Sequence, residues 1–201
     1  MKKGLLIVVS GPSGAGKGTI CKELLKQRKD LNISISATTR EPRKGEVDGV
    51  NYFFLGKNKF KEMIKSNEFL EHASVYDNFY GTPKKYVMDK LEKGEDVLLE
   101  IDIQGALKVK DIYPEGVFIF ILPPSMEELK NRIVNRGTET KEAILKRFNS
   151  AYKEINFVFK YDYGVVNDKV QSAVDNIKAI MKAEKCRVNR QKELIKKIEE
   201  V

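Results

Sequence analysis

Glycine and lysine spacing near the start of the chain gives the clearest chemical signal, in the string GPSGAGKGT at residues 11–19. An apolar run, LLIVVS, precedes this string, and a helical pattern, ICKELLKQ, follows it. In this setting the glycines let backbone N–H groups converge on phosphate oxygens, and the helix N-terminus adds a positive dipole. Lys17 can reach the outer phosphates of a nucleotide. The contacts of this predicted phosphate loop are expected from Gly11, Pro12, Ser13, Gly14, Ala15, Gly16, Lys17, Gly18 and Thr19.

One position departs from the usual form of this loop. Gly18 stands where Ser or Thr normally coordinates Mg²⁺, and Thr19 follows directly. The GKGT form resembles adenylate kinases, in which the metal is held largely through waters. Direct coordination by Thr19 is therefore left open, and a chance glycine-rich turn is the alternative to the loop as a whole.

Two acidic residues stand at the end of another apolar run, DVLLEID at 96–102. In nucleotide-binding proteins such a strand points its last acid toward the metal. Strand alternation would place Glu100 and Asp102 on one face. Both are candidates for a contact with Mg²⁺ through water.

A first group of cations lies in the string TTREPR. Arg40 and Arg43 stand three apart, beside the hydroxyls of Ser36 and Thr39. A forked guanidinium matches the oxygens of a phosphate dianion, so the pair predicts a monophosphate site. A solvated basic turn is the ordinary alternative.

A second group of cations follows residue 130. Arg132 and Arg136 are four apart on one predicted helix, and Arg147 follows in AILKRF. Three arginines converging on one place would suit the charge of a phosphoryl group in transfer. Surface ion pairs, such as Glu128 with Arg132, are the alternative.

Four apolar runs bounded by turn signals predict parallel strands buried on both faces, at 5–10, 96–102, 116–122 and 163–167. Helical patterns separate these runs. Strands alternating with helices predict an α/β fold, a three-layer parallel sheet with helices on both faces.

The helical pattern PSMEELKNRIVNRG is marked by a Ser125/Glu128 capping box and keeps Leu129 and Ile133 on one face. The last 30 residues predict a further helix.

Residues 33–82 break the alternation of strands and helices. Short strand-like pieces, NISIS, VNYFFL and EFLEHASVY, surround one helical stretch, KNKFKEMIKSN. These pieces predict an inserted α+β lobe within a single domain whose core is 1–32 and 83–201. The polar stretch NRGTETKE at 135–142 predicts a short lid over phosphates.

Composition excludes several classes of protein. The chain has 201 residues and no apolar stretch near the roughly 20 residues that span a bilayer, so we expect a cytoplasmic protein. Cys21 and Cys186 are far apart, which predicts reduced thiols, and the single histidine, His72, is expected to be structural or incidental. The formal charge of +8 fits either nucleic acid or a pocket for polyanionic small molecules.

The strings SISATTREPRKGEVDGVNYFF, EFLEHASVYDNFYGTP, LLEIDIQG and RGTET, in this order, closely resemble the guanylate kinase family. The resemblance covers essentially residues 3–185. It implies phosphoryl transfer from ATP to GMP or dGMP with Mg²⁺, in purine nucleotide metabolism, with a GMP-binding lobe. It implies no nucleic-acid or membrane partner, and leaves the oligomeric state open.

The resemblance also assigns residues to roles. Guanine presents adjacent donors at N1 and N2, which suit a carboxylate, and Glu71 matches the glutamate that reads guanine in the family. The other implied GMP contacts are Ser36, Arg40, Arg43, Tyr52, Tyr80, Thr82 and Asp102. Arg132 and Asn167 are implied contacts of the adenine of ATP. The residues implied to act in catalysis are Lys17, Arg40, Arg136 and Arg147, with Glu100 near the metal-bound water.

Two other functions remain as alternatives. A kinase of the same fold acting on AMP, dTMP or CMP would lack a carboxylate at the position of Glu71. A non-enzymatic binding module usually has a degraded phosphate loop, whereas Lys17 is present here. Nucleic-acid binding, which the charge alone suggests, ranks last, because the sequence has neither interleaved aromatic and basic residues nor a recognised module.

Overall fold

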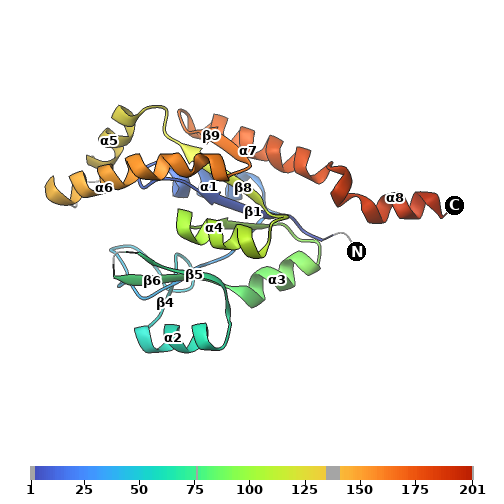
Figure 1. The fold of residues 1–201 in the computed structure, drawn as a ribbon, viewed down its shortest axis with the longest axis horizontal. Coiled ribbons are helices and arrows are strands. Elements are labelled where there is room, and N and C mark those ends of the chain that lie inside the picture. Colours follow the sequence, from blue (N-terminus) through green and yellow to red (C-terminus); the bar gives the residue numbers. More distant parts are fainter. Residues whose placement is uncertain (1–2, 76, 135–140, 201) are drawn as a thin grey trace.

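A computed structural model describes residues 3–75, 77–134 and 141–200, with side chains for all of these except 141–147 and 193. Figure 1 shows a central sheet between layers of helices. A smaller sheet with helix α2 (Lys57–Lys65) lies below this body, and helix α8 (Lys192–Glu199) extends away from it on one side.

The central sheet has five strands, and every neighbouring pair is parallel. In spatial order they are β2 (Asn32–Ile33), β7 (Val97–Glu100), β1 (Leu6–Ser10), β8 (Val117–Leu122) and β9 (Tyr163–Val166). The four predicted strands are confirmed, with small differences at their ends. The predicted place of NISIS in the lobe is wrong for its first two residues, which pair with β7. A two-residue edge strand is too short to show an apolar pattern.

Helices cover both faces of this sheet, as the apolar runs predict. One face carries α1 (Lys17–Gln27) and α7 (Val170–Lys185), and the other carries α3 (Lys84–Glu92) and α4 (Ile103–Ile112). Alternate residues of β1 supply the two faces: Ile7 and Val9 pack toward α1 and α7, whereas Leu6 and Val8 pack toward α3 and α4. Each of these buried side chains contributes about 1.5–3 kcal/mol through the removal of apolar surface from water.

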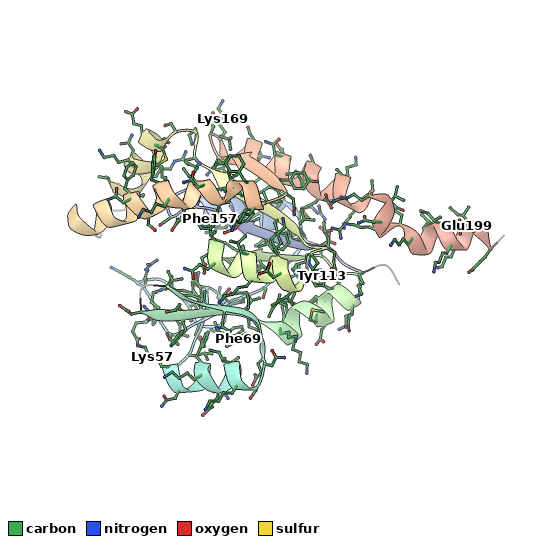
Figure 2. All side chains as sticks on the ribbon, viewed as in Figure 1. Lys57, Phe69, Tyr113, Phe157, Lys169 and Glu199 are labelled. Atoms are coloured by element: carbon green, nitrogen blue, oxygen red, sulfur yellow. The ribbon has the colours of Figure 1, made fainter. Side chains whose placement is uncertain are left out.

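The inserted lobe is built on a four-stranded sheet in the order β4 (Phe53–Phe54), β3 (Ala37–Thr38), β6 (Asn78–Pro83) and β5 (Phe69–Val75). Helix α2 covers one side of it through Phe60, whose ring stacks on Phe69 with centroids 4.5 Å apart. Figure 2 labels Phe69, which lies between the sheet and α2. The lobe therefore has a small apolar core of its own.

Strand β6 is absent from the sequence prediction because NFYGTP contains Asn, Gly and Pro, which normally indicate a turn. In the structure it pairs with β3 on one side and β5 on the other, so it is an interior strand of the lobe sheet. The predicted strand EFLEHASVY is confirmed as β5, and VNYFFL contributes the two residues of β4.

The predicted start of the helix after β8 is confirmed at its cap. The hydroxyl of Ser125 accepts a hydrogen bond from the backbone N–H of Glu128 at 3.1 Å. Helix α5 (Met126–Val134) then buries Leu129 and Ile133, the two residues of its predicted apolar face.

The chain beyond α5 differs in part from the prediction. Residues 135–140 of the predicted lid lie outside the described residues, and α6 (Lys141–Glu154) already begins at 141. The 3-10 turn η1 (Ile155–Lys160) connects α6 to β9. At the end of the chain, the single predicted helix is instead α7, the 3-10 turn η2 (Val188–Arg190) and α8. Among the described residues, none of the helices combines the length and apolar character needed to cross a bilayer.

Candidate active site

The phosphate loop joins β1 to α1 through a backbone that glycine adopts most easily. Gly11, Gly14 and Gly16 have φ angles of 143°, 90° and 93°. At Gly16 a Cβ atom would also stand 2.2 Å from the amide nitrogen of Asn167. Helix α1 begins at Lys17, so its first N–H groups lie at the loop, where an anion would bind. The predicted order of strand, loop and helix is confirmed.

Lys17 folds back over its own loop. Its Nζ donates hydrogen bonds to the carbonyl oxygens of Gly11 at 2.6 Å and Pro12 at 3.1 Å. Burial lowers the pKa of Lys17, while the nearby carboxylates of Glu100 and Glu154 oppose this shift. Binding a phosphate would therefore exchange carbonyl partners for charged oxygens that interact more strongly with the ammonium.

Asn167 supports the loop from behind. It is 3% exposed, and its Nδ2 donates to the carbonyl oxygen of Ala15 at 2.7 Å. Arg132 pairs with Glu128 at 2.7 Å, the ordinary alternative in the sequence, and also donates to the carbonyl oxygen of Asn167 at 3.1 Å. A contact of Asn167 or Arg132 with adenine stays a prediction.

A cavity of about 190 Å³ lies between the carboxyl end of the central sheet and the lobe, and we call it the lobe pocket. The predicted residues among those lining it are Lys17, Ser36, Tyr52, Glu71, Tyr80, Glu100 and Asp102. Residues from the phosphate loop, the lobe and strand β7 thus meet around one space. Arg40 and Arg43 do not line this pocket.

Glu71 is held in one position on the wall of the lobe pocket. It is 6% exposed, and its Oε1 accepts a hydrogen bond from the hydroxyl of Thr82 at 2.8 Å. Its Oε2 lies against Gly105 of α4, where a Cβ atom would stand only 2.7 Å away. We call Glu71, Thr82 and Gly105 the carboxylate cradle. The cradle fixes an acceptor group in a mostly buried place.

The pKa of Glu71 is raised to about 7, first by burial and further by the charge of Asp102. The hydrogen bond from Thr82 opposes the rise but does not cancel it. A carboxylate in this state favours a partner that brings its own hydrogen-bond donors.

The guanidinium of Arg40 lies beside acidic and aromatic side chains of the lobe. Its guanidinium pairs with Glu46 at 2.9 Å and lies 5.5 Å from the ring centroid of Tyr52. The hydrogen bond to Glu46 raises the pKa of Arg40, and Tyr80 adds to the rise. Glu46 also accepts from the backbone N–H of Arg43 at 2.7 Å. One carboxylate therefore organises both predicted arginines, and the side chain of Arg43 is exposed.

Glu100 and Asp102 both reach the lobe pocket, although by different routes. Strand β7 ends at Glu100, so the prediction that strand alternation aligns the two acids is wrong. Asp102 instead caps α4, where its Oδ1 accepts from the backbone N–H groups of Gln104 at 2.8 Å and Gly105 at 3.1 Å. A carboxylate oxygen of Glu100 lies 3.3 Å from where a Cβ of Gly18 would stand. Burial raises the pKa of Glu100, against the charge of Lys17.

Sequence reasoning missed three residues that this site uses: Glu46, Gly105 and Glu154. A glycine inside a helical pattern often has a packing reason, and this signal could have found Gly105. Glu46 stands in a basic string, and its spacing of six residues from Arg40 would bring the two side chains together in neither a helix nor a strand. Glu154 lies 141 residues from the loop that it contacts, so only the folded chain reveals it.

Two predicted residues cannot be placed at the site. Arg136 lies outside the described residues. The backbone of Arg147 is in α6, as the pattern AILKRF predicts, while its side chain is outside the described part. Their roles stay predictions.

Neither cysteine nor the histidine lines the lobe pocket. Cys21 is buried and Cys186 is exposed, and both are free thiols. His72 lies in β5, and its carbonyl oxygen accepts a hydrogen bond from the Nζ of Lys108 in α4. Burial and the charge of Lys108 lower the pKa of His72.

The fold and site together define a P-loop kinase: a phosphate loop follows the first strand of a parallel sheet, and the lobe pocket, which has an acidic wall, includes Lys17 of that loop. The sequence model of the guanylate kinase family matches residues 3–184. The chain therefore belongs to the guanylate kinase family.

Individual relatives agree with this family. The chain is 67% identical over 199 residues to the guanylate kinase of Caldanaerobacter subterraneus subsp. tengcongensis, covering 99% of this chain and 97% of the relative. It is 64% identical to the guanylate kinase of Clostridium tetani, covering 97% and 93%. The crystal structure of guanylate kinase from Anaplasma phagocytophilum superimposes with a TM-score of 0.80 at 37% identity, covering 94% of this chain and 90% of that one.

Proposed function

We propose that this protein transfers the γ-phosphoryl group of ATP to GMP, giving ADP and GDP. The observation that carries the proposal is the carboxylate cradle on the wall of a pocket that also contains Lys17 of the phosphate loop. Guanine offers N1–H and the N2 amine to a carboxylate, whereas adenine offers a lone pair at N1 and no amine at N2. The base most compatible with Glu71 is therefore guanine.

The phosphate loop would bind ATP. Its N–H groups and the N-terminus of α1 would hold the β-phosphate and γ-phosphate, and Lys17 would leave its carbonyl partners to bind phosphate oxygens. Arg136 and Arg147 would add charge around the transferring group, and Arg132 and Asn167 would adjoin the adenine.

The lobe would bind GMP. Arg40, Arg43, Tyr52 and Tyr80 would hold the phosphate, while Glu71, Thr82, Ser36 and Asp102 would surround the guanine. Glu46 supports this arrangement because it already orients Arg40 and the backbone of Arg43. We include dGMP as a second acceptor in the proposal, because it carries the same base and phosphate as GMP.

The residues present fit a Mg²⁺ ion that is held mainly by phosphates and waters. Mg²⁺ typically takes one or two carboxylates besides the phosphate oxygens, and Glu100 presents its oxygen beside the place where a side chain at residue 18 would stand. Among the described residues, no group of three or more His, Cys, Asp or Glu side chains is arranged as a metal cage. When bound, the ion would neutralise charge on the phosphates. Glu100 would hold it through water, with Asp102 and Thr19 as further candidates.

The transfer needs no general base from the protein. The second pKa of a phosphate monoester is about 6, so the attacking oxygen of GMP is already largely ionised at neutral pH. The residues then act by positioning the two phosphates and by stabilising their charge. We place this activity in cytoplasmic purine nucleotide metabolism.

A coupled assay of ADP release tests the proposal across the nucleoside monophosphates. We expect turnover with GMP and dGMP to exceed turnover with AMP, CMP and dTMP by at least about a hundredfold, because a polar site rejects a base that leaves its groups unpaired. Equal turnover of GMP and AMP would contradict the guanine assignment. A requirement for added Mg²⁺, tested with a chelator, would support the metal assignment.

A further inference from the structure

The carboxylate of Glu154 reaches the phosphate loop from a distant part of the chain. Glu154 is the last residue of α6, and its Oε2 accepts a hydrogen bond from the backbone N–H of Ser13 at 3.4 Å. Its Oε1 accepts from the hydroxyl of Ser150, one turn earlier in the same helix, at 2.9 Å. The side chain is half-buried, so this contact is shielded in part from solvent.

This contact places a negative charge where the loop is built to attract an anion. The N–H of Ser13 belongs to the loop whose amides converge on phosphate. Among the charges that act on Lys17, Glu154 is second after Glu100. A carboxylate on this amide and a triphosphate in the loop would repel each other, because both are anions in a partly desolvated place.

We propose that the carboxylate of Glu154 competes with the triphosphate for the phosphate loop and must give way when the triphosphate binds. The carboxylate accepts a hydrogen bond from the N–H of Ser13 and lies within electrostatic reach of the ammonium of Lys17. Phosphate oxygens then take over both partners, and the carboxylate of Glu154 is released from the loop toward solvent. The inference rests on the proposed binding of ATP at this loop.

The sign of the expected effect separates this role from a structural one. If the loop is partly occupied by Glu154, the apparent affinity for ATP is lowered by the fraction of molecules in that state. Removing the charge should therefore tighten the binding of ATP. If Glu154 only held the loop in shape, its removal would loosen the loop and weaken the binding of ATP.

The experiment measures the binding of a non-hydrolysable ATP analogue with Mg²⁺ by calorimetry, for the unmodified protein and Glu154→Gln. We expect Kd to fall about three- to tenfold in Glu154→Gln, which is the net scale of one ordinary intramolecular hydrogen bond. Kd for GMP should not change, and the KM for ATP should fall with Kd. Glu92→Gln removes a carboxylate from the exposed face of α3 and is the matched control, with no expected change.

A second variant keeps the test decisive if Glu154→Gln fails to fold. Ser150→Ala retains the charge but removes the hydroxyl that orients it, so a smaller decrease in Kd, about twofold, is expected. Unchanged or weaker binding of the analogue in the folded variants would overturn the proposal. Failure of the unmodified protein to bind the analogue would instead contradict the proposed function, so the two results are distinguishable.

Discussion

The phosphate loop and the carboxylate cradle recognise their ligands in opposite ways. The loop is one continuous string whose backbone N–H groups form the site, and its glycines supply positive φ angles. The cradle is made of side chains from β5, β6 and α4, and its acid is held by a hydroxyl and by the absence of a side chain at Gly105. A backbone site recognises phosphate in general, whereas a side-chain site can distinguish one base from another.

This contrast predicts that changes in the two regions have separable effects. A change in the loop should reduce the transfer step and leave GMP binding intact. A change in the cradle should weaken GMP binding and leave ATP binding intact. The following variants test the separation in order of decreasing expected effect.

Lys17→Ala should give the largest effect. Loss of the ammonium that meets the developing charge should lower kcat at least about a hundredfold, which corresponds to about 3 kcal/mol of the barrier. Calorimetry should show that GMP still binds within about twofold of the unmodified protein. Lys22→Ala, an exposed change on the same helix, is the control. Normal turnover in Lys17→Ala would exclude the loop from the reaction.

Gly105→Ala should act on the cradle alone. The new Cβ would stand 2.7 Å from Oε2 of Glu71, so the carboxylate must move away from its place beside Thr82. We expect GMP binding to weaken by about 1–3 kcal/mol, with the Kd of the ATP analogue unchanged.

Gly56→Ala is the matched control for this change. Gly56 lies in the lobe, where nothing stands within 4 Å of the added Cβ and the φ angle is −65°. If both variants bind GMP as the unmodified protein does, the close approach of Gly105 has no role in positioning Glu71.

Glu71→Gln should change how the stability of the protein depends on pH. The folded pKa of about 7 is above the ordinary 4.5, so the folded protein holds this proton more tightly than the unfolded chain does. The resulting stabilisation is present below about pH 4.5 and is lost as the pH rises toward 7.

Glutamine does not ionise. The free energy of unfolding of Glu71→Gln, relative to that of the unmodified protein, should therefore rise by about 2.5 kcal/mol between pH 5 and pH 8. Denaturant titration at both pH values measures this gain. A constant difference between the two proteins across this range would show that Glu71 ionises normally in the folded state.

How far the sequence predicts each region also follows from the contrast. The loop is contiguous, and its glycines and Lys17 indicate strand, loop and helix without knowledge of the fold. Glu71 could be predicted from the resemblance of its string to a family. The same resemblance names Thr82 as a guanine contact. That Thr82 holds Glu71, and that Gly105 leaves room for it, could not be predicted, because these residues come from different elements and meet only after folding.

Other differences between sequence and structure have equally local causes. Asp102 faces the lobe pocket as the cap of α4, whereas the sequence suggests the alternation of a strand that in fact ends two residues earlier. Strand β6 carries Gly81 and Pro83, whose turn preference is overridden by pairing with β5. Strand pairing and helix capping depend on neighbours in space, which the periodicity of the sequence does not reveal.

The most direct test of the account compares GMP with IMP, which lacks only the N2 amine, in the unmodified protein and in Glu71→Gln. If the carboxylate reads this amine, calorimetry at pH 8 should show GMP preferred over IMP by about tenfold or more in the unmodified protein. The preference should largely disappear in Glu71→Gln, giving a coupling free energy of about 1–2 kcal/mol between the carboxylate and the amine. An equal preference for GMP in both proteins would show that another group reads guanine, and the role given to Glu71 would be contradicted.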